Sequence, residues 1–176
     1  MDDEQTSNNG TMTTTVEERD IALERTFDAP RQQVFEAFTD PEKVVKWWGP
    51  NGWVTEVRKM EVKPGGMWHY CMHGPEGKES WGKAVYHEVH VPERLKYTDS
   101  FADAEGNTIK DMPETAVTID FVDFEGKTRL VSRVEFASTA DLENVLAMGL
   151  VQGIDETWDR LATYLSETAE ALHPSM

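Results

Sequence analysis

The chain has 176 residues, of which 39% are hydrophobic, enough for one domain with a core of its own. It carries 33 acidic and 17 basic residues, a formal net charge of −16. Such a surface repels phosphate backbones and anionic lipids, so we expect no nucleic-acid partner. No stretch approaches the ~20 apolar residues that a membrane span needs, so we expect no membrane insertion.

Residues 1–17 are polar and lack periodicity, which predicts a disordered tail. The acidic N-terminus has neither the basic nor the apolar region of a signal peptide, so a cytoplasmic protein is expected. The only cysteine, Cys71, has no partner for an internal disulfide, which agrees with a reducing compartment.

The ordered chain is expected to begin with a strand over 20–27, where apolar and polar residues alternate. Two short helices should follow it. Asp28 and Asp40 are candidate helix caps, and each lies just before a proline suited to a first helical turn. Gly49 and the proline after it should end the second helix.

Residues 53–137 have strand-like patterns separated by turn-forming residues. The alternation in the first of these strands slips, which predicts a bulge near Arg58 or Lys59. Two strands should join at 92–94, and a loop should cover 103–114. The sequence 115–136 is typical of a β-hairpin with its turn at Glu125 and Gly126.

The last segment has apolar residues spaced three and four apart from Thr139 onward. This spacing predicts one long amphipathic helix of about eight turns. The stripe consists of Leu142, Val145, Leu146, Leu150, Ile154, Trp158, Leu161 and Leu165. Helices at the two ends of an antiparallel strand region indicate an α+β fold, with a curved sheet gripping the long helix.

Four segments, in this order, resemble a known family. They are "FDAPRQQVFEAFTDPEKVVKWWGP", "KPGGMWHY", "GPEGKESWGKAVYHEVHVPERLKYTDSF" and "LAMGLVQGIDETWDRLATYL". The family comprises the bacterial single-domain relatives of the activator of the heat-shock protein 90 ATPase. It belongs to the START-like helix-grip superfamily, with polyketide cyclases and the birch pollen allergen.

The resemblance implies a seven-stranded antiparallel sheet wrapped around a long C-terminal helix, with two short helices after the first strand. It also implies a cavity for an apolar ligand between the sheet and that helix. We therefore expect one domain over 18–168, between the polar tail and a flexible C-terminal tail over 169–176. The eukaryotic activator has a second, N-terminal domain, which we do not expect in these 176 residues.

His69, Cys71 and His73 lie two residues apart on one expected strand. Side chains at this spacing share one face but are about 7 Å apart, whereas metal ligands converge to about 2.0–2.3 Å from one ion. Two of them would need help from another strand, for example from His87 or His90. We therefore expect no metal site.

The opposite face of that strand is expected to point at the long helix. It carries large apolar and aromatic side chains, which either fill the core or line a ligand cavity. The candidate ligand-binding residues are Trp48, Trp68, Tyr70, Met72, Tyr86, Ile119, Phe121, Met148, Gly149 and Gly153.

Two local patterns are compatible with a cavity but also have ordinary packing explanations. Trp47 and Trp48 are about 100° apart around their helix, so one of them should lie near the surface, at a pocket mouth or a helix end. Gly149 and Gly153 each cost about 1 kcal/mol inside a helix. Either a neighbouring backbone approaches them closely, or they leave space for a ligand.

Catalytic motifs are absent from the sequence: it has no G-x-S-x-G, no phosphate-binding loop and no dinucleotide fingerprint. Cys71 and a neighbouring histidine would be too far apart for direct proton transfer. Glu56, Glu88 and Asp120 lie in expected strands, where they either face inward as acid–base candidates or form a solvated outer face. We expect no catalytic residues and no cofactor.

Three functions remain open. The first is a monomer or weak dimer that binds a small apolar or amphipathic molecule. The second is a co-chaperone-like protein that docks on a chaperone or another protein. The third is a cofactor-free enzyme catalysing a cyclisation, dehydration or hydrolysis, as in some members of the superfamily.

Overall fold

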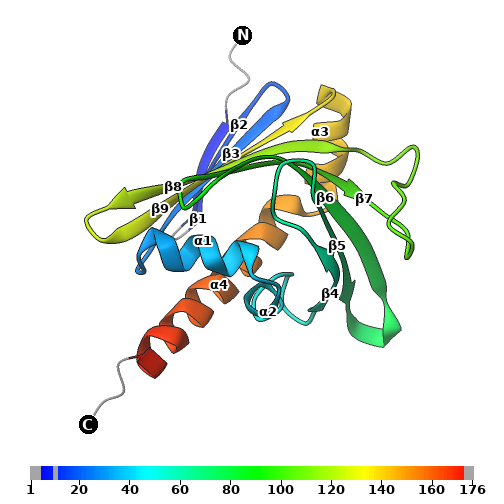
Figure 1. The fold of residues 1–176 in the computed structure, drawn as a ribbon. Helices are drawn as coiled ribbons and strands as arrows, with labels where there is room; N and C mark the ends of the chain where they lie inside the picture. Colours follow the sequence, from blue (N-terminus) through cyan, green and yellow to red (C-terminus); the bar gives the residue numbers. More distant parts are fainter. Residues whose placement is uncertain (1–4, 10–11, 173–176) are drawn as a thin grey trace.

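The computed structural model describes residues 5–9 and 12–172. Its fold is α+β: a curved, antiparallel, nine-stranded sheet encloses the C-terminal helix on its concave side (Figure 1). The strands are β1 (Gln5–Asn9), β2 (Met12–Glu17), β3 (Asp20–Phe27), β4 (Val54–Met60), β5 (Met67–His73), β6 (Glu79–His90), β7 (Arg94–Phe101), β8 (Thr115–Phe124) and β9 (Lys127–Phe136), in the sheet order β1-β2-β3-β9-β8-β7-β6-β5-β4.

The helices are α1 (Arg31–Thr39), α2 (Pro41–Val44), α3 (Thr139–Ala147) and α4 (Leu150–Leu172), with a 3₁₀ turn at Pro75–Gly77. None of these helices combines the length and the apolar composition that crossing a bilayer requires. The two short helices α1 and α2 follow β3, as expected, but α2 ends at Val44, before the two tryptophans and short of the expected end at Gly49. Asp40 caps α2 by accepting a hydrogen bond from the backbone N–H of Glu42, whereas Asp28 is not the cap of α1, since Pro30 holds that position.

Two local predictions in the sheet are confirmed. The register of β4 against β5 shifts between Val57 and Lys59, which is the expected bulge. The β8–β9 hairpin turns at Glu125 and Gly126, and both have positive φ, as a two-residue turn between twisted strands requires.

The expected seven strands and the expected disordered tail over 1–17 need correction. Residues 12–17 form β2, which pairs with β3, and β1 pairs with β2. Met12 is fully buried and Thr14 is 3% exposed. The run of threonines suits a strand because β-branched residues favour extended backbone. The α4 helix also passes the expected boundary at residue 168, while residues 1–4, 10–11 and 173–176 lie outside the described chain.

The expected single C-terminal helix is instead two helices, α3 and α4, separated at Met148 and Gly149. Gly149 has a φ of +88°, in the left-handed region where glycine has no steric penalty, so the chain can end one helix and start another. The Gly149 N–H bonds back to the carbonyl of Leu146 at 3.0 Å. Hydrophobic periodicity misses this break because the apolar stripe continues across it.

The core lies between the concave face of the sheet and α4, with α1 closing one side. Trp158 of α4 contacts Phe27 of β3 edge to face, with ring centroids 6.1 Å apart. Phe35 and Phe38 of α1 pack in the same way on Phe121 of β8. These aromatic contacts fix α4 and α1 over one half of the sheet, and a cavity lies beside them.

Candidate functional site

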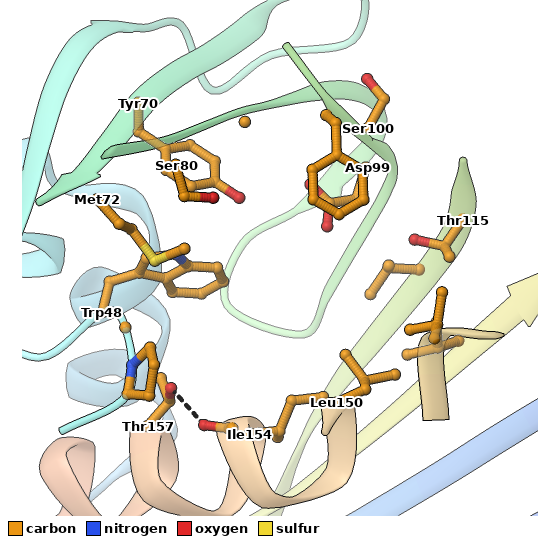
Figure 2. A pocket seen from close by; sticks show the side chains of 18 of the residues that line it. Trp48, Tyr70, Met72, Ser80, Asp99, Ser100, Thr115, Leu150, Ile154 and Thr157 are labelled. Carbon is orange, nitrogen blue, oxygen red and sulfur yellow. Dashed lines mark hydrogen bonds between the residues drawn. The ribbon is translucent and has the colours of Figure 1, made fainter. Parts of the chain in front are cut away.

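A cavity of about 350 Å³ lies between the sheet and the N-terminal part of α4. Strands β5 to β9 form one wall, α3 and α4 form another, and the segment 48–50 closes one end. Figure 2 shows Trp48, Tyr70 and Met72 on one side of it, opposite Leu150 and Ile154. Its volume lies in the range of small-molecule sites, which start at about 300 Å³.

A glycine positions the aromatic side of this cavity. Gly82 of β6 lies opposite Tyr70 of β5, and a Cβ at Gly82 would lie 2.7 Å from the Tyr70 ring. The missing side chain lets the Tyr70 ring lie over the β6 backbone, stacked on Trp68 with centroids 4.3 Å apart. Trp48 packs edge-on against both rings. Tyr70 is therefore held in a fixed orientation, with its hydroxyl group directed into the cavity (Figure 2).

Asp99 of β7 is a carboxylate in this apolar cavity wall. Its burial raises its pKa from 3.8 to about 7, although a hydrogen bond from Tyr70 acts in the opposite direction. Burial, reinforced by the negative charge of Asp99, raises the pKa of Tyr70 and Tyr97 above the ordinary range. Both hydroxyls therefore keep their protons near neutral pH, and Asp99 is the group that gains or loses one.

Sequence reasoning missed Asp99. The sequence contains a signal for it. Asp99 is two residues from both Tyr97 and Phe101 in β7, so the three side chains share one face of the strand, and all three residues line the cavity. A carboxylate at an inward position of a strand is unusual enough to mark a functional candidate. Other cavity residues that sequence reasoning missed include Phe38, Ser80, Thr115, Leu150, Ile154 and Thr157.

The helical wall contains open space. An added Cβ at Gly149 or Gly153 would meet no atom within 4 Å, and both glycines line the cavity. Of the two explanations for these glycines, the absence of close contacts favours space over a tightly packed backbone.

Arg160 of α4 holds the end of the cavity in place. Its Nη1 donates to the backbone oxygens of Gly49 at 2.7 Å, Pro50 at 3.0 Å and Trp53 at 3.0 Å. Three carbonyls from one loop thus converge on one guanidinium nitrogen, and Gly49 and Pro50 line the cavity. Trp48 is partly buried at this end, whereas Trp47 is fully buried.

Seven of the ten candidate ligand-binding residues line the cavity. They are Trp48, Tyr70, Met72, Ile119, Met148, Gly149 and Gly153. Trp68, Tyr86 and Phe121 do not: they are buried in the core behind the wall, where Trp68 and Tyr86 support Tyr70 and Tyr97 by ring contacts. The parity of a strand predicts which face a side chain takes, but not whether it reaches the cavity surface.

The three acid–base candidates lie on the solvated outer face of the sheet and not in its interior. Glu56, Glu88 and Asp120 lie on the convex face of the sheet, between 34% and 43% exposed, and each forms an ion pair with a basic side chain. They do not contact the cavity.

The row of His69, Cys71 and His73 also faces away from the cavity, and its members have different surroundings. His69 is 5% exposed and bonds through Nε2 to the carbonyl of Asp103 at 2.9 Å. Cys71 and His73 are closer together than expected: their ligand atoms and a carboxylate oxygen of Glu79 lie within 4.8 Å of one another. The expected spacing of about 7 Å ignored that strand side chains lean along the chain.

Cys71 is not an activated nucleophile. Its side chain is buried, and burial together with the negative charge of Glu79 raises the pKa of the thiol to about 11. A reactive cysteine needs the opposite, a lowered pKa beside a positive charge.

The fold and its cavity define the chain as a helix-grip protein, and comparison with known proteins places it more closely. The sequence model of the family "Activator of Hsp90 ATPase homolog 1-like protein" matches residues 28–166. The chain belongs to this family. A search of curated proteins found no match to it.

Three solved bacterial structures are similar over most of the chain. Protein Ms6760 from Mycobacterium smegmatis is 28% identical, with a TM-score of 0.78, covering 84% of this chain and 91% of its own. A protein from Arthrobacter aurescens is 26% identical, with a TM-score of 0.81 and coverages of 93% and 91%. One from Staphylococcus epidermidis is 28% identical, with a TM-score of 0.78 and coverages of 87% and 93%. The family name describes the activity of its namesake, and it fixes no activity for this chain.

Proposed function

We propose that this protein binds a small amphipathic molecule in the cavity between the sheet and α4. The observation that carries the proposal is the cavity itself, about 350 Å³ in volume and walled mainly by apolar side chains. Small-molecule sites combine such an apolar wall with a few placed polar groups. Here the polar groups include Tyr70, Asp99 and Thr157.

The polar groups suggest how a ligand is oriented. The apolar body would lie against Ile154 and Leu150 of α4, and a hydrogen-bond donor of the ligand would face Asp99. A neutral or cationic group suits this position, because an anion would meet a carboxylate that is itself disfavoured as a charge by burial.

The first test is native mass spectrometry of the protein purified gently from its own host. The proposal expects a reproducible excess mass that disappears on denaturation and whose value corresponds to an organic molecule. A small neutral probe with one N–H donor, N-phenyl-1-naphthylamine, then tests the cavity directly, because its fluorescence rises in apolar surroundings.

Gly153 provides a matched pair of variants for the probe. Gly153→Leu should fill the cavity and abolish the rise in fluorescence, while Gly153→Ala adds one methyl group and should weaken binding only slightly. Replacing exposed Val122 by leucine serves as a surface control, since Val122 is 42% exposed on the sheet. If Gly153→Leu folds and binds the probe as the unchanged protein does, the proposed cavity is not the binding site.

A second candidate, a cofactor-free enzyme, is favoured by one observation. Asp99 has a pKa of about 7 in the cavity wall, and a general acid or base works best when its pKa lies near the operating pH. A ligand that copurifies with Asp99→Asn from the same host would then be chemically altered on incubation with the unchanged chain. It should be recovered intact with Asp99→Asn; equal alteration by both would remove Asp99 from the reaction.

A further inference from the structure

Three side chains of different ligand type converge on the convex face of the sheet, away from the cavity. They are Cys71 and His73 of β5 and Glu79 of β6. Their ligand atoms all lie within 4.8 Å of one another, close enough to share one ion. In the part of the chain that the structure describes, no other three His, Cys, Asp or Glu side chains meet this condition. The strand register explains the meeting, since His73 lies directly opposite Glu79.

From this geometry we infer a zinc-binding site formed by Cys71, His73 and Glu79. A thiolate, an imidazole and a carboxylate are the three ligand classes that Zn²⁺ takes in proteins. The distance between the Cys71 Sγ and the Glu79 Oε2 is 3.7 Å. Two such ligands on a tetrahedral zinc ion, at about 2.3 Å and about 2.0–2.2 Å from it, lie roughly 3.6 Å apart. The two atoms are therefore already at the separation the ion needs.

A second carboxylate holds the ring of His73. His73 Nε2 is 2.9 Å from Oε1 of Glu56, on the adjacent strand β4. If the proton of His73 is on Nε2 and is donated to that carboxylate, the lone pair on Nδ1 is free to bind an ion. Histidines that bind zinc usually donate their other ring N–H to a carboxylate or a carbonyl in this way. Glu56 is itself held by Arg58 Nε at 2.9 Å. The orientation of His73 thus has support from two further residues.

The carboxylate is held in the same way. The indole N–H of Trp81 donates to Oε2 of Glu79 at 3.2 Å, and Trp81 lies opposite Cys71 on the neighbouring strand. Glu79 is therefore fixed between Trp81 and Cys71. Cys71 is buried, but His73 and Glu79 are exposed, so an ion there would keep a position open to solvent. Three protein ligands and one open position are the pattern of zinc sites that bind water or another molecule.

The test uses the full chain stripped with a chelator and titrated with Zn²⁺ in competition with a chromophoric chelator. We expect one zinc ion per chain. Cys71→Ser, His73→Ala and Glu79→Gln should each weaken binding at least about tenfold, and Glu56→Gln about tenfold through the loss of its support to His73. Co²⁺ in place of Zn²⁺ should give a thiolate-to-cobalt charge-transfer absorption that Cys71→Ser abolishes.

The sheet offers a matched control. His90 and Glu88 form a second exposed histidine–glutamate pair, 3.2 Å apart, that is not part of the converging group. His90→Ala should leave zinc affinity unchanged. Because Cys71 is buried, its variant is checked for folding by circular dichroism, while the exposed His73→Ala carries the test if Cys71→Ser is unfolded. Zinc binding that survives His73→Ala, or a cobalt complex without thiolate absorption, would overturn the assignment.

Discussion

Thr157 donates its hydroxyl to the backbone oxygen of Gly153, 2.7 Å away and one turn back along α4 (Figure 2). Both residues line the cavity, and a Cβ at Gly153 would meet nothing within 4 Å. The helix therefore leaves space beside Gly153, about one turn from a polar side chain on the same wall. A glycine inside a helix lowers stability, so this space is maintained at the expense of folding free energy.

Replacing Gly153 by alanine should raise the free energy of unfolding by about 0.5–1 kcal/mol, because alanine has the higher helix propensity and the site has room for a methyl group. Urea denaturation measures the change. Gly149→Ala is the matched comparison: its φ of +88° is unfavourable for alanine, which should lower stability by about 1–2 kcal/mol. Equal signs for the two variants would contradict the structure at one of these positions.

Replacing Arg160 by leucine should lower the free energy of unfolding by roughly 2–4 kcal/mol. The reason is that three carbonyls of the loop that closes the cavity lose their donor. One hydrogen bond from a charged group contributes about 1.5–3 kcal/mol, and the three carbonyls share the two protons of one nitrogen, so their contributions do not add in full. The same urea experiment on Arg133→Leu is the control, because Arg133 is exposed and makes one ion pair, with Asp20 at 3.4 Å. That variant should change stability by less than about 0.5 kcal/mol. A similar loss for both would mean that Arg160 does not anchor the loop.

Two methionines test the added strand β2. Met12 is fully buried, so Met12→Ala should lower the free energy of unfolding by about 2–5 kcal/mol. Met148 is 63% exposed at the break between α3 and α4, and Met148→Ala should have an effect within about 0.5 kcal/mol. Thermal and urea unfolding of both variants gives the comparison. If Met12→Ala does not change stability, residues 12–17 do not form a packed strand and belong to the disordered tail that their composition predicts.

Sequence patterns predicted the elements whose periodicity is regular and whose ends have specific residues. The hairpin at Glu125 and Gly126, the bulge near Arg58 and the Asp40 cap are of this kind, since each depends on a few adjacent residues. The break at Gly149 was missed because apolar periodicity does not record backbone φ. Strand β2 was missed because its threonines look polar, although pairing with β3 buries Thr14.

The site was predictable to the level of a strand face but not of individual contacts. The alternation in β5 placed Tyr70 and Met72 on the inner face correctly. It gave no warning that Trp68 lies behind Tyr70, because ring stacking depends on the gap over Gly82 on the next strand. The meeting of Cys71 with Glu79 likewise depends on the β5–β6 register, which no single-strand pattern contains.

Asp99 should make stability depend on pH. Its pKa in the folded chain, about 7, lies above the unfolded value of about 3.9. The folded chain therefore binds this proton more tightly, so the contribution to stability is complete below about pH 4 and is lost as the pH rises through 7. Asp99→Asn removes this dependence.

Urea unfolding of both proteins at pH 5 and pH 8 measures the effect. Between these values the unchanged protein should lose roughly 2 kcal/mol more stability than Asp99→Asn, since one unit of pKa shift corresponds to about 1.4 kcal/mol. The comparison cancels the other carboxylates, including Asp155, whose pKa is also raised by burial and stays the same in both proteins. Parallel pH dependences would show that the pKa of Asp99 is not raised in the folded chain, so that Asp99 is ionised at pH 5 and favours a cationic group of the ligand beside it over a neutral one.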